Sequence, residues 1–141
     1  MVAAPGKVFS AMIVDDSDAD VYLASHFLQR SGRFEHVWGI TEPEDALALF
    51  QQFEETAAND ERFPPSLILL DINMPRMNGF EFLEALQKLD LARKPIVVIV
   101  SSSDHENDRT RAAQSPLVRE YVTKPLSKTL AAELADRLFD E

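Results

Sequence analysis

The chain of 141 residues contains no cysteine, so neither a disulfide framework nor a thiolate metal site can form. No apolar run approaches the length of a membrane span. The first residues, MVAAPGKVF, also lack the cationic start and the long apolar core of a secretory signal peptide. These absences predict a cytoplasmic protein that makes no use of a membrane.

Basic residues are in the minority, because 14 Lys and Arg stand against 24 Asp and Glu and give a net charge of -10. No Lys/Arg cluster offers the basic surface that phosphate contacts need, so nucleic acid is not an expected partner. The length, with 45% hydrophobic residues, fits one domain with a real core. We expect a short N-terminal arm at residues 1–7 and one domain at 8–141.

Short runs rich in Val, Ile and Leu have the length and composition of strands buried on both faces. Four such runs lie at residues 8–14, 66–70, 95–100 and 119–123, and residues 34–40 form a fifth, less regular candidate strand. Helical periodicity fills the intervals, after Ser17 and up to Gly32, then at 41–53, 79–89, 104–114 and after Ser127. This alternation predicts an α/β fold with a five-stranded parallel sheet and helices on both faces, doubly wound as (βα)5 and flavodoxin-like. Residues 57–65 are expected to form an extended loop.

Polar residues follow four of the five predicted strands. Asp15 and Asp16 follow the first, Asp71 the third, Ser101 the fourth and Lys124 the fifth. The carboxyl ends of parallel strands share one edge of the sheet, where ligands bind. Three carboxylates held together there would repel one another, so a cation is expected, and Mg2+ suits a small set of hard oxygen ligands.

The chemistry that fits this group of residues is phosphoryl transfer to a carboxylate. Asp71 would attack in line while the metal and Lys124 neutralise the transferring oxygens, and Lys124 would pair with Asp71 at rest. A calcium loop starting at Asp16 is excluded, because its sixth position, which needs glycine, is Val21. Asp18 and Asp20 are interpreted as favouring the positive end of the first helix, without a chemical role.

The segments MIVDDS, LILLDINMPRMNGFEFL, VIVSSS and YVTKPL carry a known pattern. In their order and spacing they resemble the response-regulator receiver domain of two-component signalling, from about residue 8 to 139. The resemblance implies that Asp71 accepts a phosphoryl group from a histidine kinase or a histidine phosphotransfer protein. It also implies that Asp16, Asp71 and the backbone carbonyl of Asn73 bind Mg2+ directly, and that Asp15 acts through water.

Further roles follow from the same resemblance. Lys124 matches the family's invariant lysine, and Pro125 after it matches a position that often follows a cis peptide bond. Ser101 matches the hydroxyl residue that swings toward the phosphoryl group, and Tyr121 matches the aromatic switch behind it. The positions that tune self-catalysed dephosphorylation correspond to Asn73 and Ser103.

The pattern runs close to the last residue, which predicts a stand-alone receiver whose output is contact with a downstream protein or onward relay of the phosphoryl group. A monomer or a homodimer is expected. Residues 114–118, QSPLV, depart from the family's small-Gly-Ala turn, so the docking face beyond the fourth helix is expected to be reshaped. The gap from Asp16 to Asp71 is also long, and the loop at 57–65 would absorb it.

Two alternative functions stay open at this point. A receiver that is never phosphorylated could act as a binding module, although the intact set of polar strand ends argues against it. A phosphohydrolase with an aspartate nucleophile is disfavoured, because the position two residues after Asp71 is Asn73 and an amide cannot donate a proton to a leaving group. We therefore expect a phosphoacceptor signalling domain, with only self-catalysed phosphorylation and slow self-catalysed dephosphorylation.

Overall fold

The computed structural model describes residues 8–56, 64–91 and 93–139, in which five parallel strands form one sheet in the order β2-β1-β3-β4-β5. The strands are β1 (Val8–Val14), β2 (Phe34–Ile40), β3 (Leu67–Leu70), β4 (Ile96–Ser101) and β5 (Val118–Thr123). The helices are α1 (Asp18–Arg30), α2 (Pro43–Thr56), α3 (Gly79–Gln87), α4 (Glu106–Ala113) and α5 (Lys128–Phe139). The predicted α/β class and doubly wound parallel sheet are confirmed.

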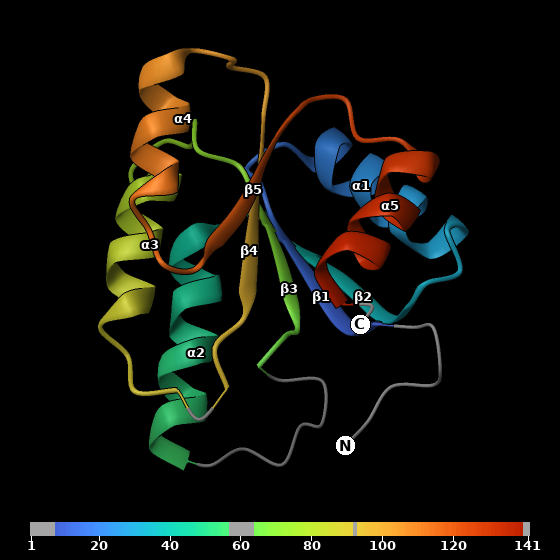
Figure 1. Cartoon of the computed structure of the whole chain (residues 1–141). Coiled ribbons are helices and arrows are strands. Elements are labelled where there is room, and N and C mark those ends of the chain that lie inside the picture. Colours follow the sequence, from blue (N-terminus) through green and yellow to red (C-terminus); the bar gives the residue numbers. More distant parts are fainter. Residues whose placement is uncertain (1–7, 57–63, 92, 140–141) are drawn as a thin grey trace.

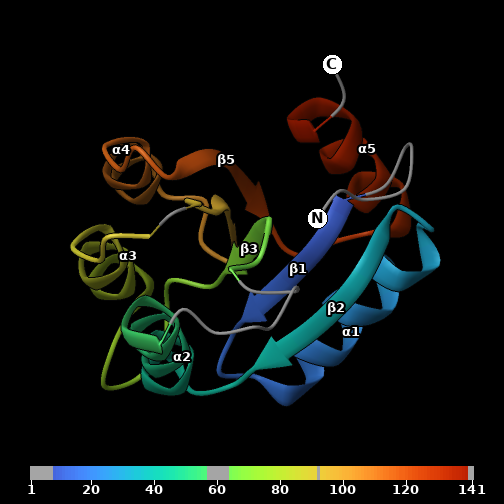
Figure 2. The same ribbon diagram turned by 90° about the horizontal axis from the view of Figure 1, so that it is seen from below.

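Different helices cover the two faces of the sheet (Figures 1 and 2): α2, α3 and α4 lie on one face, and α1 and α5 on the other. Successive side chains of a strand point to opposite faces, so Met12 of β1 joins the core under α2 to α4, while Ile13 joins the core under α1 and α5. The fully buried Phe82 anchors the first core, and the fully buried Leu134 anchors the second. Burial on both faces explains why the central strands β1, β3 and β4 read as continuous apolar runs, whereas β2 and β5 at the edges of the sheet are only partly buried.

Side-chain caps fix the starts of three helices. The Ser17 hydroxyl accepts a hydrogen bond from the Asp20 N–H at 3.2 Å, and the Ser127 hydroxyl accepts one from the Leu130 N–H at 3.0 Å, which confirms both predicted caps. Asn78 and Glu81 form a reciprocal capping box at the start of α3. This box was not predicted, although the N-x-x-E spacing before an apolar run is its usual signature.

The segment between α4 and β5, where the sequence departs from the family pattern, is a tight turn. The Val118 N–H donates to the Ser115 carbonyl at 3.2 Å, and the Leu117 N–H donates to the Ser115 hydroxyl at 3.3 Å. The register between β4 and β5 then shifts between Val97 and Val98. The extra residue of β5 allows the strand to pair again beyond the altered turn.

Several expected boundaries differ from the structure by one to three residues. Helix α3 ends at Gln87, so Leu89 lies beyond it and packs against the core from the following turn. Strand β4 includes Ser101, which was expected to follow it. The expected arm at 1–7, and residues 57–63 of the expected loop, lie outside the described residues. Among the residues that are described, no helix is long and apolar enough to cross a membrane.

Candidate functional site

The sheet holds two aspartates at its carboxyl edge by extending its ladder one residue past the strands. The Asp15 N–H donates to the Ile40 carbonyl at 3.2 Å, and the Asp71 N–H donates to the Val14 carbonyl at 2.9 Å. The backbones of both aspartates are thereby fixed by neighbouring strands, and both residues are only 5% exposed. The predicted convergence of strand ends is confirmed for these two residues.

An acidic cluster forms where these strands end. Asp15, Asp16 and Asp71 each present a carboxylate oxygen, and the three oxygens lie within 4.8 Å of one another. Burial raises the pKa of Asp71, and the nearby Asp15 charge raises it further, while Lys124 opposes both effects. The ionised cluster is therefore held together against repulsion, which a bound cation would relieve.

The donor set of the cluster fits a divalent cation. Carboxylate oxygens are hard ligands, and a site with so few of them leaves room for the waters that Mg2+ retains. Asp16 is exposed and can reach a cation from the solvent side. The Asn73 N–H lies 3.5 Å from Asp71 Oδ1, while the predicted role of the Asn73 carbonyl as a metal ligand stays a prediction.

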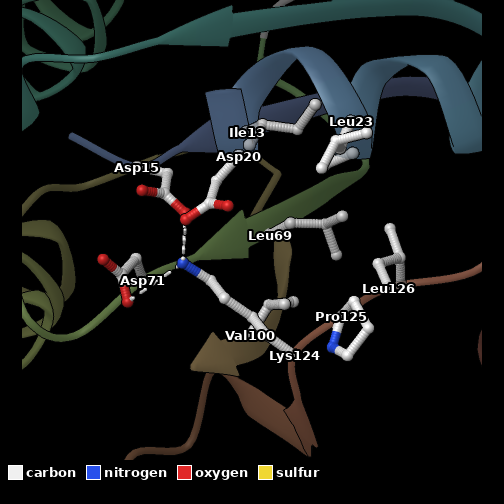
Figure 3. A pocket seen from close by; sticks show the side chains of 11 residues that line it. Ile13, Asp15, Asp20, Leu23, Leu69, Asp71, Val100, Lys124, Pro125 and Leu126 are labelled. Carbon is white, nitrogen blue, oxygen red and sulfur yellow. Dashed lines mark hydrogen bonds and ion pairs between the residues drawn. The ribbon is translucent and has the colours of Figure 1, made fainter. Parts of the chain in front are cut away.

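Lys124 points its ammonium group into the acidic cluster (Figure 3). Its Nζ lies 2.7 Å from Asp20 Oδ2, 2.8 Å from Asp15 Oδ2 and 3.8 Å from Asp71 Oδ1. Burial lowers the pKa of Lys124, but its hydrogen bonds to Asp15 and Asp20 outweigh that effect and raise it overall. Lys124 was expected to pair with Asp71 at rest, but of its three carboxylate contacts the one with Asp71 is the longest.

Asp20 lies in the first turn of α1, as expected for a residue that favours the helix dipole, but its carboxylate also binds Lys124, and this contact was not predicted. The sequence carried a signal that could have found this contact. Asp20 lies four and eight residues before Ala24 and Leu28, which are both buried, so it stands on the inward face of α1. A carboxylate on a buried helix face needs a partner, and Lys124 is that partner.

The loop after β5 is tied to the end of β4. The Lys124 N–H donates to the Ser101 carbonyl at 2.8 Å, and the peptide bond before Pro125 is cis, as the family resemblance implied. The Ser101 side chain is fully buried, and its hydroxyl accepts a hydrogen bond from the Ser103 N–H at 3.1 Å. The Ser103 hydroxyl in turn donates to Asp108 Oδ2 at 2.8 Å, which connects this loop to the first turn of α4.

Tyr121 contacts the same loop from the edge strand β5. Its hydroxyl donates to the Ser103 carbonyl at 2.6 Å, and the guanidinium of Arg109 lies 4.5 Å from its ring centroid. Arg109 also donates to Thr123 Oγ1 at 3.2 Å and to Asp104 Oδ1 at 2.6 Å. Arg109 was not among the predicted site residues, because nothing in the sequence spacing shows that α4 places it over the Tyr121 ring.

A glycine allows α3 to begin directly beside the acidic cluster. A Cβ atom at Gly79 would lie 2.6 Å from the backbone oxygen of Asp71 and 2.8 Å from the Ile72 Cα. The Gly79 N–H donates to the Ile72 carbonyl at 3.1 Å, so the close approach is also hydrogen-bonded. The glycine therefore lets α3 begin in close contact with the backbone of Asp71 and Ile72.

A small cavity of about 70 Å³ lies beside Lys124 (Figure 3). Its polar side carries Asp15, Asp20 and Asp71, and its remaining walls are largely apolar, with Leu69 and Leu126 among them. The stem of Lys124 borders this cavity.

Comparison with known proteins matches residues 11–136 to the model of the response regulator receiver domain. The response regulator Rcp1 of Synechocystis is 37% identical over 85% of this chain and 78% of Rcp1. The protein PilH of Pseudomonas aeruginosa is 32% identical over 88% of this chain and 96% of PilH.

Solved structures show the same fold. A two-component response regulator from Cytophaga hutchinsonii has a TM-score of 0.81 at 28% identity, covering 96% of this chain and 99% of that one. The phosphorylated cyanobacterial phytochrome response regulator RcpA has a TM-score of 0.70 at 26% identity, covering 92% and 89%. The Mn2+-bound response regulator Rcp1 has a TM-score of 0.71 at 26% identity, covering 90% and 91%.

Proposed function

Because the chain belongs to the response regulator receiver domain family, we propose that it is a signalling protein that accepts a phosphoryl group on Asp71 in a Mg2+-dependent reaction. The observation that carries the proposal is the position of Asp71, which is buried beside Asp15, within 4.8 Å of the other carboxylates of the cluster, and faced by Lys124. A phosphorylated RcpA and a Mn2+-bound Rcp1 support the same chemistry in similar proteins.

The phosphoryl donor is proposed to be a histidine kinase or a histidine phosphotransfer protein. An oxygen of the Asp71 carboxylate attacks the phosphorus and forms a P–O bond. The P–N bond to the donor imidazole breaks, and the nitrogen keeps the electron pair. The product is an acyl phosphate on Asp71 and a free histidine, so atoms and charge balance without a further reactant.

The side chains around Asp71 have complementary proposed roles. Asp15, Asp16, Asp71 and the Asn73 carbonyl would hold Mg2+, which supplies positive charge to the phosphoryl oxygens when bound. Lys124 gives a second positive charge at one of those oxygens. The hydroxyl of Ser101 donates a hydrogen bond to another once it leaves the Ser103 N–H.

Output is proposed to pass through Tyr121 and the loop after β4. Movement of Ser101 toward the phosphoryl group would pull on the Ser103 segment to which the Tyr121 hydroxyl is bonded. Phosphorylation then shifts a population between two loop arrangements and changes the surface offered to a downstream protein, or the phosphoryl group is relayed onward. Asn73 and Ser103 are proposed to tune the lifetime of the acyl phosphate.

Incubation with acetyl phosphate and Mg2+, followed by acid quench and intact-mass measurement, tests the proposal. One phosphoryl adduct is expected for the wild type, none in EDTA and none for Asp71→Asn. Asp18→Asn is the matched control, because this exposed aspartate lies on the same edge and should leave the adduct intact. An adduct that persists in Asp71→Asn, or none in the wild type even with a candidate kinase, would refute the assignment.

A further inference from the structure

We propose that Asp20 is a positioning residue that holds Lys124 away from Asp71 in the unphosphorylated protein and competes with the phosphoryl group for it. The inference rests on the proposed function, because it assigns a regulator to the phosphoryl-binding role of Lys124. Asp20 lies outside the set of residues proposed to bind the metal, and its carboxylate forms an ion pair with Lys124.

Distances show which carboxylates hold the ammonium group at rest. Lys124 Nζ is 2.7 Å from Asp20 and 2.8 Å from Asp15, both hydrogen-bond distances. Its 3.8 Å separation from Asp71 is too long for a hydrogen bond. Lys124, which would stabilise the charge of a phosphoryl group on Asp71, is therefore bound to Asp15 and Asp20 in the unphosphorylated protein.

The two carboxylates that hold Lys124 belong to one hydrogen-bonded turn. The Ser17 N–H donates to Asp15 Oδ1 at 3.0 Å, and the Ser17 hydroxyl accepts from the Asp20 N–H at 3.2 Å. The start of α1 thus fixes Asp20 relative to Asp15. The same turn caps α1 and binds Lys124. The backbone of Asp20 is therefore fixed by hydrogen bonds, and its carboxylate is held in position beside the lysine.

The pair between Asp20 and Lys124 is one that can be broken. The Asp20 side chain is 39% exposed, against 6% for Asp15, so solvent can replace the ammonium group at Asp20. The cavity beside the lysine stem gives Lys124 room to turn (Figure 3). Phosphorylation converts the carboxylate of Asp71, with one negative charge, into an acyl phosphate with nearly two, and the added charge draws the lysine across.

Initial phosphorylation rates at saturating Mg2+ and fixed acetyl phosphate test the inference. Asp20→Asn keeps the shape of the side chain and removes its charge, so Lys124 is held by Asp15 alone and reaches the phosphoryl oxygens more readily. We expect a rate increase of about two- to fivefold, the range for releasing one partly exposed ion pair. Asp20→Glu retains the charge and should remain within about 1.5-fold of the wild type, by the same measure.

Asp18→Asn controls for the loss of one negative charge near the site, because Asp18 shares the first turn of α1 and is exposed. It should leave the rate unchanged. An unchanged or slower rate in Asp20→Asn would overturn the inference, as would an equal acceleration in Asp18→Asn. If instead the wild type forms no adduct on Asp71, the proposed function fails first, so the two failures are distinguishable.

A second measurement needs neither metal nor phosphodonor. Urea unfolding in EDTA of Asp20→Asn, Lys124→Met and the double variant forms a double-mutant cycle. The double variant should lose less stability than the two single variants together, because each single change already breaks the ion pair. Additive losses would show that the two side chains are uncoupled and would overturn the inference.

Discussion

The middle of the sheet and its carboxyl edge are buried to nearly the same degree but have opposite chemistry. Val97, Val98 and Ile99 in the middle of β4 are fully buried among apolar neighbours, whereas Asp15 and Asp71 at the edge are 5% exposed. Burial of apolar side chains stabilises the fold, but burial of Asp71 raises its pKa and makes its ionised form unfavourable. The middle of the sheet thus stabilises the protein, while the edge costs stability and provides the site.

The largest expected effect of a single substitution is a loss of unfolding free energy in the apolar core. Phe82→Ala removes a fully buried ring from the core under α2 to α4 and should cost about 3–5 kcal/mol in unfolding free energy. Urea denaturation measures this cost, and Phe82→Leu, which keeps most of the volume, should cost less. A loss below about 1 kcal/mol would mean that this core is not packed as described.

A smaller loss of stability is expected for a substitution at Gly79, where the apolar core meets the carboxyl edge of the sheet. Gly79→Ala places a methyl group against the Asp71 backbone, and relieving the clash should cost about 1–3 kcal/mol and slow phosphorylation. Gly32→Ala is the matched control, because that glycine has φ +73° and no atom within 4 Å of a new Cβ. It should lose about 1 kcal/mol from backbone strain with phosphorylation unaffected.

Two results would contradict this prediction: phosphorylation of the Gly79→Ala variant at the wild-type rate, or equal slowing of phosphorylation in the Gly32→Ala variant. Either result would mean that the close approach of Gly79 to the Asp71 backbone does not position the phosphoacceptor.

The smallest predicted effect has the opposite sign and belongs to the edge alone. In the metal-free protein at neutral pH, Asp71→Asn should stabilise the fold, because it removes a buried charge and its repulsion by Asp15, which Lys124 offsets only in part. The gain should be about 1 kcal/mol, the size of the Coulomb energy of two unit charges about 4 Å apart in water. Thermal unfolding in EDTA measures the gain. Asp18→Asn, at an exposed position, should show much less.

The gain should depend on pH in a definite direction. The pKa of Asp71 is raised in the folded protein, so its carboxyl group favours folding while protonated and loses that contribution as the pH rises through the folded-state pKa. The advantage of Asp71→Asn should therefore shrink as the pH falls and the wild-type carboxyl becomes neutral. A pH-independent advantage, or a loss at neutral pH, would contradict the assignment of Asp71 to a repulsive cluster.

Positions that depend on strand order could be predicted from the sequence. Asp15, Asp71 and Lys124 each follow an apolar run. Parallel strands bring such residues to one edge of the sheet, regardless of the conformation of the loops. The caps at Ser17 and Ser127 were equally accessible, because they depend on spacing within a few residues. Local pattern and sheet topology were enough for these residues.

Contacts between elements distant in the chain could not be predicted in the same way. Which carboxylate Lys124 prefers depends on how α1 rotates against the sheet, and this favours Asp20 over Asp71. The stacking of Arg109 on Tyr121 depends on the packing of α4 against β5. The alternative partners of such side chains differ by small free energies, and the pattern of residues along the sequence does not reveal which partner is favoured.

The most direct test of the central claim is to locate the phosphoryl group chemically. After reaction with acetyl phosphate and Mg2+, borohydride reduces an aspartyl phosphate to homoserine, which tandem mass spectrometry can assign to one position in the chain. The account predicts homoserine at position 71 alone, with none in protein treated without phosphodonor. Homoserine at position 15 or 16, or a phosphoryl adduct that borohydride leaves intact, would contradict it.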